Sequence, residues 1–391
     1  MLSIRSACSA PQFCASLHAK YRRHKPYRKT YLLEEEFGVD DHIAGPNPQT
    51  SPAAGGSANP RQSSPAQNGH KFYSRRSYGA LDLGTNNCRL LVARPAEDGF
   101  TVIDAFSRIV RLGEGLSTTG RLSDGAIERA IAALSICADK LRRRHVSLSR
   151  SVATEACRRA ANGRYFVRRV REETGIALDI ISPQEEARLA VLGCHILLEP
   201  GEGPALIFDI GGGSTELVLI EPGGEEPEIL SWYSAPWGVV SLAEKEFNDL
   251  TTLEDRLATY ERMRNRVAAS FADFASTLPT IGYQPRLLGT SGTVTTLASV
   301  HLGLPSYDRS KIDGLVLPSA ALRAVSTDLA HKSVEERADV PCIGSERADL
   351  VVAGCAILEA IMDIWPAERI GIADRGIREG ILRSMMANAR R

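Results

Sequence analysis

The amino-acid sequence predicts an α/β protein built from two similar domains that face each other across a cleft. Two segments resemble each other at a constant spacing of 127 residues, so that Asp82 matches Asp209 and Gly84 matches Gly211. From Tyr78 onward, apolar runs of strand length alternate with longer amphipathic segments, which is typical of layered α/β architectures. With 43% apolar residues, the chain is able to bury the cores of two domains.

The beginning of the chain differs in composition from the rest. Residues 1–77 carry 11 basic and 5 acidic side chains, with no acid among the first 33. Over residues 44–70, 19 of 27 residues are Pro, Gly, Ser, Asn or Gln, which bury too little apolar surface to offset the entropy of ordering. We expect a disordered basic and Pro/Gly/Ser-rich tail over residues 1–77, for which a solvated segment or a start codon assigned too early is a better interpretation than a transit peptide. Domains over residues 78–190 and 191–391 should follow.

The formal net charge of zero hides an uneven distribution that excludes some functions. The 47 basic and 47 acidic residues of the whole chain leave 36 basic and 42 acidic residues after the tail. Such a body has no global basic field, so we expect no nucleic-acid partner. No apolar run approaches the roughly 20 residues of a membrane-spanning helix. The eight cysteines contain no CxxC pair, which predicts reduced thiols and a cytoplasmic location.

Each copy of the repeat is typical of a β-hairpin whose turn is suited to binding phosphate. Glycines let the backbone approach an anion closely, and consecutive turn N–H groups form an anion-binding nest. A third small-residue turn occurs at residues 289–293. The predicted phosphate-binding residues of the three turns are Gly84, Thr85, Asn86 and Asn87, then Gly211, Gly212, Gly213, Ser214 and Thr215, and finally Ser291 and Gly292.

An aspartate lies at the end of the first strand of each hairpin. Asp82 and Asp209 are hard oxygen ligands of the kind that Mg²⁺ prefers, either directly or through water. The sequence therefore predicts Mg²⁺ as the cofactor.

Helical periodicity and end signals predict seven helices. They are expected over residues 123–145, 156–174, 253–278, 317–332, 346–364 and 376–389, and from residue 182 onward. The apolar segment 350–365 fits a buried helix better than a dimer interface.

A helix start between the two repeats separates two adjacent glutamates. Ser182 fits an N-cap, Pro183 the first helical position and Glu185 the N3 position, which together form a capping box. Glu185 should then reach back to the cap. Glu186 is rotated by about 100° and is free to project elsewhere, with its ionised form favoured by the helix N-terminus. From the residues alone, a glutamate that only stabilises the helix dipole is the better interpretation of Glu186.

The duplicated Asp-x-Gly hairpins resemble the phosphate loops of the sugar kinase, heat-shock chaperone and actin superfamily, which has a duplicated ribonuclease-H-like fold. Within it, the chain resembles the exopolyphosphatase/guanosine pentaphosphatase (Ppx/GppA) family over residues 78–383. Seven blocks follow the family's order: ALDLGTNNCRLLVAR, RIVRLGEGL, VATEACRRAANG, IISPQEEARLA, IFDIGGGSTELV, LLGTSGTVTTLA and IADRGIREGIL.

The resemblance implies roles for individual residues. The family's motif places its catalytic glutamate at Glu186, and it implies that Glu216 positions water or metal as a second catalytic residue. It also makes Asp82 and Asp209, together with Glu216, partners of Mg²⁺. Arg158 is the arginine chosen for phosphate binding, because a planar guanidinium group matches phosphate oxygens.

Three further charged residues of these blocks receive no site role. Arg375 and Arg378 fit equally well as ion-pair partners of Asp374 and Glu379. Glu155 fits a surface acid.

The resemblance implies a Mg²⁺-dependent exopolyphosphatase that hydrolyses the terminal phosphates of inorganic polyphosphate with water activated by Glu186. A guanosine pentaphosphate 5′-phosphohydrolase is the alternative enzyme, because both substrates end in a phosphoanhydride. A kinase of the same superfamily would need an acceptor site, and two glutamates fit water activation better. A non-catalytic polyphosphate- or alarmone-binding sensor would need the loops but not the carboxylates. Relatives are often dimeric, so the resemblance also implies a homodimer.

Overall fold

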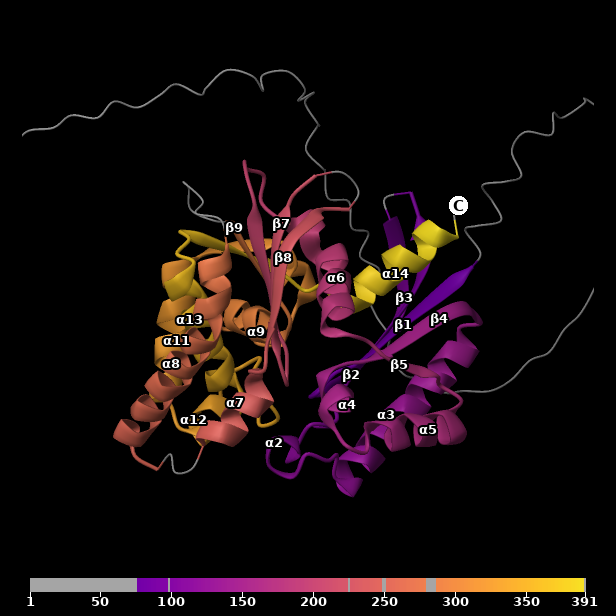
Figure 1. Ribbon diagram of the computed structural model, residues 1–391, viewed down its shortest axis with the longest axis horizontal. Helices are drawn as coiled ribbons and strands as arrows, with labels where there is room; N and C mark the ends of the chain where they lie inside the picture. Colours follow the sequence, from indigo (N-terminus) through magenta and orange to yellow (C-terminus); the bar gives the residue numbers. More distant parts are fainter. Residues whose placement is uncertain (1–75, 98, 224–225, 248–250, 279–285, 390–391) are drawn as a thin grey trace, which may run out of the picture. The chain divides into compact units, whose positions relative to one another are not determined.

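Two mixed β-sheets with the same strand order form the framework of the protein (Figure 1). The first sheet has the order β3-β2-β1-β4-β5, and the second has the order β10-β11-β9-β6-β7-β8. When the second sheet is read backwards, β8, β7, β6, β9 and β11 take the places of β3, β2, β1, β4 and β5, with the same parallel and antiparallel pairings. β10 adds an antiparallel edge strand. The predicted fold of two duplicated α/β domains is confirmed.

The computed structural model describes most of the chain that follows the predicted tail. The described residues are 76–97, 99–223, 226–247, 251–278 and 286–389, all of which belong to one unit, Ser64–Arg391. The tail predicted for residues 1–77 lies almost entirely outside them, so its disorder stays a prediction. We call the first sheet with its covering helices the N-terminal lobe, and the second sheet with its covering helices the C-terminal lobe.

The strands of both sheets are short, as in most globular domains. Those of the first sheet are β1 (Ser77–Leu83), β2 (Asn87–Ala96), β3 (Gly99–Ile109), β4 (Val146–Ala153) and β5 (Leu178–Ile180). Those of the second sheet are β6 (Ala205–Ile210), β7 (Thr215–Glu221), β8 (Glu228–Ala235), β9 (Arg286–Thr290), β10 (Leu315–Pro318) and β11 (Arg369–Ala373).

Helices follow the strands in an alternating order. Those before β6 are α2 (Leu116–Thr119), α3 (Asp124–Arg143), α4 (Glu155–Arg159), α5 (Gly163–Thr174), α6 (Pro183–Cys194) and the 3₁₀ turn η1 (His195–Leu197). Those after it are α7 (Val239–Glu246), α8 (Leu253–Thr277), α9 (Gly292–His301), α10 (Arg309–Ile312), α11 (Ser319–His331), α12 (Val334–Ala338), α13 (Val351–Ile364) and α14 (Ile377–Asn388).

Each lobe has its own apolar core on the outer face of its sheet. In the N-terminal lobe, α3 and α5 bury Leu134 and Phe166 against the first sheet. In the C-terminal lobe, α8 and α13 pack together, and every residue of α13 from Val351 to Met362 is buried. The apolar segment around α13 is therefore core, as preferred from the sequence.

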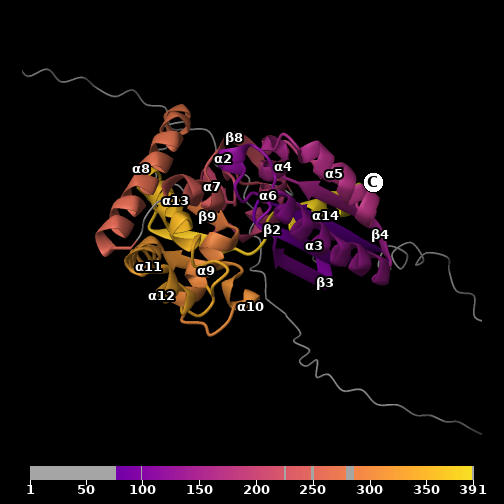
Figure 2. The ribbon, with the colours of Figure 1, turned by 90° about the horizontal axis from the view of Figure 1, so that it is seen from below.

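The inner faces of the two sheets are covered by α6 and α14, which lie side by side between the sheets (Figures 1 and 2). α6 follows the last strand of the first sheet but packs on the second, where Val191 contacts the cluster around Ile207. α14 follows β11 of the second sheet but packs on the first, where Ile381 joins the cluster around Tyr78. The predicted domain boundary after residue 190 falls inside α6 and stays a prediction.

Glycines allow α6 and α14 to cross at very short distance. A Cβ atom on Gly193 would lie 2.0 Å from the carbonyl oxygen of Gly376, and one on Gly380 would lie 2.0 Å from that of Leu189. Real Cβ atoms do not approach backbone this closely, so both positions exclude any side chain. The crossing therefore fixes how the two exchanged helices meet.

The predicted helix over residues 156–174 is wrong in one respect, because the chain breaks it into α4 and α5. The side chain of Asn162 bonds both the backbone N–H and the carbonyl of Leu122, at 2.9 Å each. These bonds hold the break and tie it to the loop before α3. Similarly, α13 begins at Val351 rather than at residue 346, because residues 341–350 form turns.

The predicted capping box of α6 forms only in part. Ser182 accepts a hydrogen bond from the backbone N–H of Glu185 at 3.2 Å, with Pro183 at the start of the helix. The Glu185 carboxylate does not return to the cap but pairs with Arg150 at 2.9 Å and Arg188 at 2.8 Å. Charge-assisted bonds to two guanidinium groups outweigh a single bond to a backbone N–H.

The cysteines and the helices can be compared with the expectations of reduced thiols and of no membrane-spanning segment. The described cysteines are all free, and five of them, including Cys88 and Cys355, are buried as predicted. Within the described residues, none of the helices combines the length and apolarity needed to cross a bilayer.

A substitution in the helix crossing should separate its role from ordinary helix propensity. Gly380→Ala should lower the free energy of unfolding by about 3 kcal/mol, because the new methyl group would overlap the Leu189 carbonyl. Gly125→Ala in α3 is the matched control, since its Cβ would meet nothing closer than 3.6 Å. Urea unfolding of both variants is the measurement. Equal stability of Gly380→Ala and the wild type would show that α6 and α14 are not held at this distance.

Candidate active site

The two phosphate-loop candidates are built alike and touch each other. In the first loop the N–H of Gly84 donates to the carbonyl of Asn87 at 2.9 Å, and in the second the N–H of Gly211 donates to that of Ser214 at 3.0 Å. A Cβ on Gly213 would lie 2.7 Å from Oγ1 of Thr85. Glycine in the second loop therefore lets the turns of the two lobes come into contact.

Hydrogen bonds from α7 hold the second loop from behind. The N–H groups of Val239 and Val240 donate to the carbonyls of Gly211 and Gly212 at 3.0 and 2.8 Å. Because these carbonyl oxygens are occupied, the loop presents fewer acceptors that would repel an anion.

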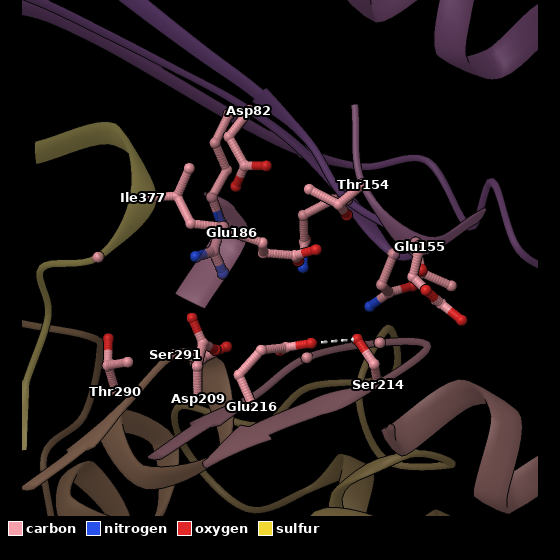
Figure 3. A pocket seen from close by; sticks show the side chains of 18 of the residues that line it. Asp82, Thr154, Glu155, Glu186, Asp209, Ser214, Glu216, Thr290, Ser291 and Ile377 are labelled. Atoms are coloured by element: carbon pink, nitrogen blue, oxygen red, sulfur yellow. Dashed lines mark hydrogen bonds between the residues drawn. The ribbon is translucent and has the colours of Figure 1, made fainter. Parts of the chain in front are cut away.

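The loops border a cleft of about 730 Å³ between the lobes, part of it open to solvent, which we call the active-site cleft. Figure 3 shows Asp82 and Glu186 reaching into it from one side and Asp209 and Glu216 from the other. Its charged lining residues are Asp82, Glu155, Glu186, Asp209, Glu216, Asp374, Arg89, Arg375 and Arg378. Six carboxyl groups and three guanidinium groups therefore share one opening.

Glu186 projects from the first turn of α6 and is 7% exposed. Its Oε2 accepts a hydrogen bond from Nη1 of Arg158 at 2.7 Å, and the same nitrogen donates to the carbonyl of Ile181 at 2.8 Å. The other side of the guanidinium group bonds Glu155 at 2.7 Å. Arg158 thus orients Glu186 through one of its two carboxylate oxygens.

Glu216 lies on β7 directly opposite Asp209 on β6. It is 2% exposed, and its Oε1 accepts hydrogen bonds from the hydroxyl groups of Ser214 at 2.7 Å and Ser234 at 2.9 Å. In the first lobe the same register places Arg89 opposite Asp82. The repeat has therefore exchanged a carboxylate for a guanidinium group at one position.

The carboxyl groups of the cleft raise one another's pKa. Burial raises the pKa of Glu216 to about 7, and the charge of Asp209 adds to the shift. Burial likewise raises the pKa of Asp209 to about 6, with a further contribution from Asp82. The pKa values of Asp82 and Glu186 are also raised, again chiefly by burial. Four acids that resist ionising together form a site suited to a cation.

For Glu186, burial outweighs the helix N-terminus that was expected to favour its ionised form. The neighbouring Glu216 raises the pKa of Glu186 further, and Arg158 opposes both effects without cancelling them. Glu186 can therefore serve as a base near neutral pH only when positive charge in the cleft offsets its neighbours.

Mg²⁺ fits these residues as a partly hydrated ion. Oδ1 of Asp82 is buried and has no hydrogen-bond partner among the described residues, and the same holds for Oδ1 of Asn86. No three His, Cys, Asp or Glu side chains in the described part of the chain are grouped closely enough to hold a metal on their own. Mg²⁺ commonly takes one or two carboxylates and completes its shell with water and substrate phosphate, which agrees with this arrangement.

Ser291 occupies a strained turn between β9 and α9. Its backbone φ of 83° and ψ of −177° lie in a region that is otherwise almost confined to glycine, at a cost of about 1–3 kcal/mol. Its hydroxyl group hydrogen-bonds Asp209. The strained turn thus places a hydroxyl donor against a cleft carboxylate.

Most of the predicted site residues line the active-site cleft, and three do not. Thr215 is fully buried and donates to the carbonyl of Trp237 at 2.6 Å. Gly292 begins α9 outside the cleft lining. Arg158 lies behind Glu186. The catalytic, phosphate-binding and metal-binding roles themselves stay predictions.

Sequence reasoning missed several residues of the lining. Glu155, expected on the surface, has a side chain that is 14% exposed and borders the cleft. Arg375 pairs with Asp313 at 2.7 Å rather than with its neighbour Asp374. Arg89 could have been found, because the repeat spacing aligns it with Glu216.

When divalent cations are absent, replacing the buried carboxylate of Glu216 should stabilise the protein. The pKa of Glu216 in the folded state is about 7, above its ordinary value of 4.5. Protonated Glu216 therefore makes its full contribution to the free energy of unfolding below pH 4.5, and this contribution is lost as the pH rises through 7. In EDTA, Glu216→Gln should therefore be more stable than the wild type at pH 8, by on the order of 3 kcal/mol, and equal to it near pH 4.5. Urea unfolding at both pH values measures this.

Glu221→Gln is the matched control, because Glu221 is exposed at the end of the same strand. It should change stability little at either pH. A Glu216→Gln variant that is less stable than the wild type at pH 8 would contradict the electrostatic interpretation of the cleft.

Comparisons with known proteins find relatives along most of the chain. Residues 91–389 match the sequence profile of the Ppx/GppA phosphatase family. Exopolyphosphatase 2 of Mycobacterium tuberculosis is 30% identical over 320 residues, which cover 78% of this chain and 97% of that protein. The crystal structure of the Aquifex aeolicus Ppx/GppA family member has a TM-score of 0.65 at 28% identity and covers 81% of this chain and 99% of its own. An exopolyphosphatase from Cytophaga hutchinsonii has a TM-score of 0.70 at 25% identity, with coverage of 80% and 98%. The chain belongs to the Ppx/GppA phosphatase family.

Proposed function

We propose that the protein is a Mg²⁺-dependent exopolyphosphatase that removes terminal phosphates from inorganic polyphosphate. The observation that carries the proposal is the meeting of two glycine-bearing loops with four buried carboxyl groups in one cleft. Loops of this kind bind phosphate, and the carboxyl groups provide a base and ligands for a cation. Exopolyphosphatase is also the name given to the relatives from Mycobacterium tuberculosis and Cytophaga hutchinsonii.

In the proposed reaction, the terminal phosphate lies against the loop N–H groups and Glu186 accepts a proton from water. The water oxygen bonds to the terminal phosphorus while the bond from that phosphorus to the bridging oxygen breaks. The electron pair of the broken bond stays with the bridging oxygen of the shortened chain, and inorganic phosphate is the second product. Arg158 holds Glu186 in position through its 2.7 Å hydrogen bond. Positioning and electrostatic stabilisation supply most of the acceleration in phosphoryl transfer.

Mg²⁺ would be held by Asp82, Asp209 and Glu216, directly or through water. When bound, it would neutralise charge on the phosphate oxygens and on the carboxylates. Ser214 and Ser234 keep Glu216 in place through their bonds to its Oε1. The free cysteines fit the reducing cytoplasm that we propose as the location.

Phosphate release is the experiment that tests this function. It should be followed with Mg²⁺ present on short polyphosphate, long polyphosphate, guanosine pentaphosphate and ATP. Preference for polyphosphate supports the proposal, and preference for guanosine pentaphosphate would favour a 5′-phosphohydrolase of the same family. Binding without release from any of the four would favour a sensor.

Changing the proposed base should remove most of the activity. Glu186→Gln should lower kcat on polyphosphate by about 10²–10⁴, because the amide cannot accept the proton from water. Glu185→Gln is the matched control one residue earlier, since Glu185 pairs with Arg150 and Arg188 and does not line the cleft. Steady-state phosphate release measures both variants, and a single cooperative melting transition confirms that each of them folds. Turnover of Glu186→Gln near that of the wild type would remove this residue from the role.

Activity should depend on Mg²⁺ bound by the aspartates at the ends of β1 and β6. EDTA should abolish phosphate release, and Asp82→Asn should raise the Mg²⁺ concentration for half-maximal activity by about 10-fold or more, because a weaker ligand replaces a carboxylate. Titrating Mg²⁺ against phosphate release measures the change. Asp139→Asn, in an exposed part of α3, is the control and should behave as the wild type. Full activity in EDTA would contradict the metal requirement.

A further inference from the structure

In each lobe, the segment that follows the third strand supports a phosphate loop from behind. In the C-terminal lobe this segment is α7, whose first N–H groups bond the carbonyls of the second loop. In the N-terminal lobe it is residues 110–119, which follow β3, end in α2 and are called here the supporting segment of the first loop. The N–H groups of Val110 and Arg111 donate to the carbonyl of Asn86 at 2.8 and 3.0 Å. The repeat thus extends beyond the hairpins to the segments that hold them.

α2 and α7 join these two segments across the lobes, and they lie next to each other in both views of the molecule (Figures 1 and 2). Oε1 of Glu244, on α7, accepts a hydrogen bond from the backbone N–H of Gly115 at 2.6 Å. Oε2 of the same side chain accepts a bond from the hydroxyl group of Ser117. One carboxylate of the C-terminal lobe therefore holds the start of α2 with both of its oxygens.

The local sequence explains why α2 depends on this carboxylate. Gly115 is the N-cap residue of α2 and has a φ of 73°, a left-handed conformation that favours glycine. Because glycine has no side chain, α2 has no side-chain cap of its own. With four residues, α2 is also too short to be stable alone. Glu244 supplies, from the other lobe, a negatively charged acceptor at the helix end where N–H groups lack partners.

A second interlobe contact holds the other end of the supporting segment. Arg111 donates to both carboxylate oxygens of Asp349, at 2.9 and 3.2 Å, and to the carbonyl of Glu346 at 3.1 Å. Its backbone φ of 47° is uncommon for a residue other than glycine, so the contact is made at some conformational cost. The segment behind the first loop is therefore attached to the C-terminal lobe at both ends.

The carboxylate of Glu244 lies next to the place where the two phosphate loops touch. A space of about 240 Å³ is lined by Ser117 and Glu244 and also by Thr85 and Gly213, the residues at which the loops meet. In Figure 1 this contact of α2 with α7 lies below the crossing of α6 and α14. The lobes are consequently joined at two separate places, and the polar one adjoins the loops.

We propose that Glu244 is a positioning residue that fixes the first phosphate loop in the place relative to the second that the terminal phosphate requires. This inference rests on the proposed function, in which the terminal phosphate lies against the loop N–H groups. Without Glu244 each loop keeps its shape, because its supporting bonds come from its own lobe. Substrate binding should therefore suffer less than the chemical step, which needs water, phosphorus and both loops in alignment.

The test measures kcat and KM on tripolyphosphate at a temperature well below the melting transition of every variant. Glu244→Ala should lower kcat by about 10–100-fold and raise KM by less than about 3-fold, because the loops lose their relative position while each keeps its donors. Glu244→Gln should keep most of the activity, since its amide oxygen still accepts the bond from Gly115. Glu254→Ala is the control, because Glu254 is an exposed acid of the same lobe and lines neither the cleft nor the space beside Glu244.

A variant on the other side of the contact separates positioning from a general loss of stability. Ser117→Ala removes one of the two bonds at an exposed position and leaves α7 unchanged. It should lower kcat by about 2–5-fold, and this effect should disappear when Glu244 is already alanine, because both side chains act through one contact. Thr118→Ala, at the next exposed position, is the matched control. Ser117→Ala also serves as the test if Glu244→Ala does not fold.

Two kinetic results would overturn the proposal. One is a kcat of folded Glu244→Ala equal to that of the wild type, and the other is independent, multiplying effects of Glu244→Ala and Ser117→Ala. If the wild type releases no phosphate from any substrate, the proposed function fails instead. Hydrogen exchange then still tests the contact, since the amides of residues 110–119 should exchange about 10-fold faster in Glu244→Ala than in the wild type or Glu254→Ala. Unchanged exchange would show that Glu244 does not hold this segment.

Discussion

The close crossing of α6 and α14 is the constraint on which the arrangement of the site depends. Each helix leaves one sheet and packs on the other, so neither lobe completes its inner face alone. Gly193 and Gly380 allow the helices to meet at backbone distance. The first turn of α6 carries Glu186 into the cleft, while α14 starts beside Arg375 and Arg378 at its rim. The same helix crossing consequently determines both the packing of the lobes and the geometry of the candidate site.

Such a site is costly for the folded protein in the absence of a cation. Asp82, Asp209, Glu186 and Glu216 are desolvated together, and the pKa of each is raised. Residues that only supported the fold would not be expected to accumulate this unfavourable charge, since apolar side chains of similar volume would fill the space at lower free energy. The cluster therefore indicates that the site was selected for chemistry rather than for stability.

Features that depend on local sequence could be predicted, and those that depend on tertiary partners could not. The repeat, the hairpins around Asp82 and Asp209 and the start of α6 follow from periodicity, turn residues and caps, which are local. Glu185 pairs with arginines and does not bond the helix cap because Arg150, which is distant in sequence, lies beside it. Glu155 likewise looks like a surface charge until β4, α4 and α6 are brought together, where Arg158 bonds both Glu155 and Glu186. No pattern within these segments contains that information.

The divergence between the two halves of the repeat explains why duplicated loops can serve different purposes. Asp209 faces Glu216 across the β6–β7 hairpin, whereas Asp82 faces Arg89 across β1–β2. Two identical carboxylate-bearing hairpins would have added a fifth acid to the four buried ones of the cleft, and their mutual repulsion would have been difficult to offset. With Arg89 in one copy, positive charge lies next to Asp82 and Asp209 and lowers the pKa of both, against the effect of burial. The same guanidinium group also borders a neighbouring space whose lining contains no carboxyl group. A single change between the repeats thus separates a carboxylate-rich space from an arginine-lined one while keeping both on the same pair of loops.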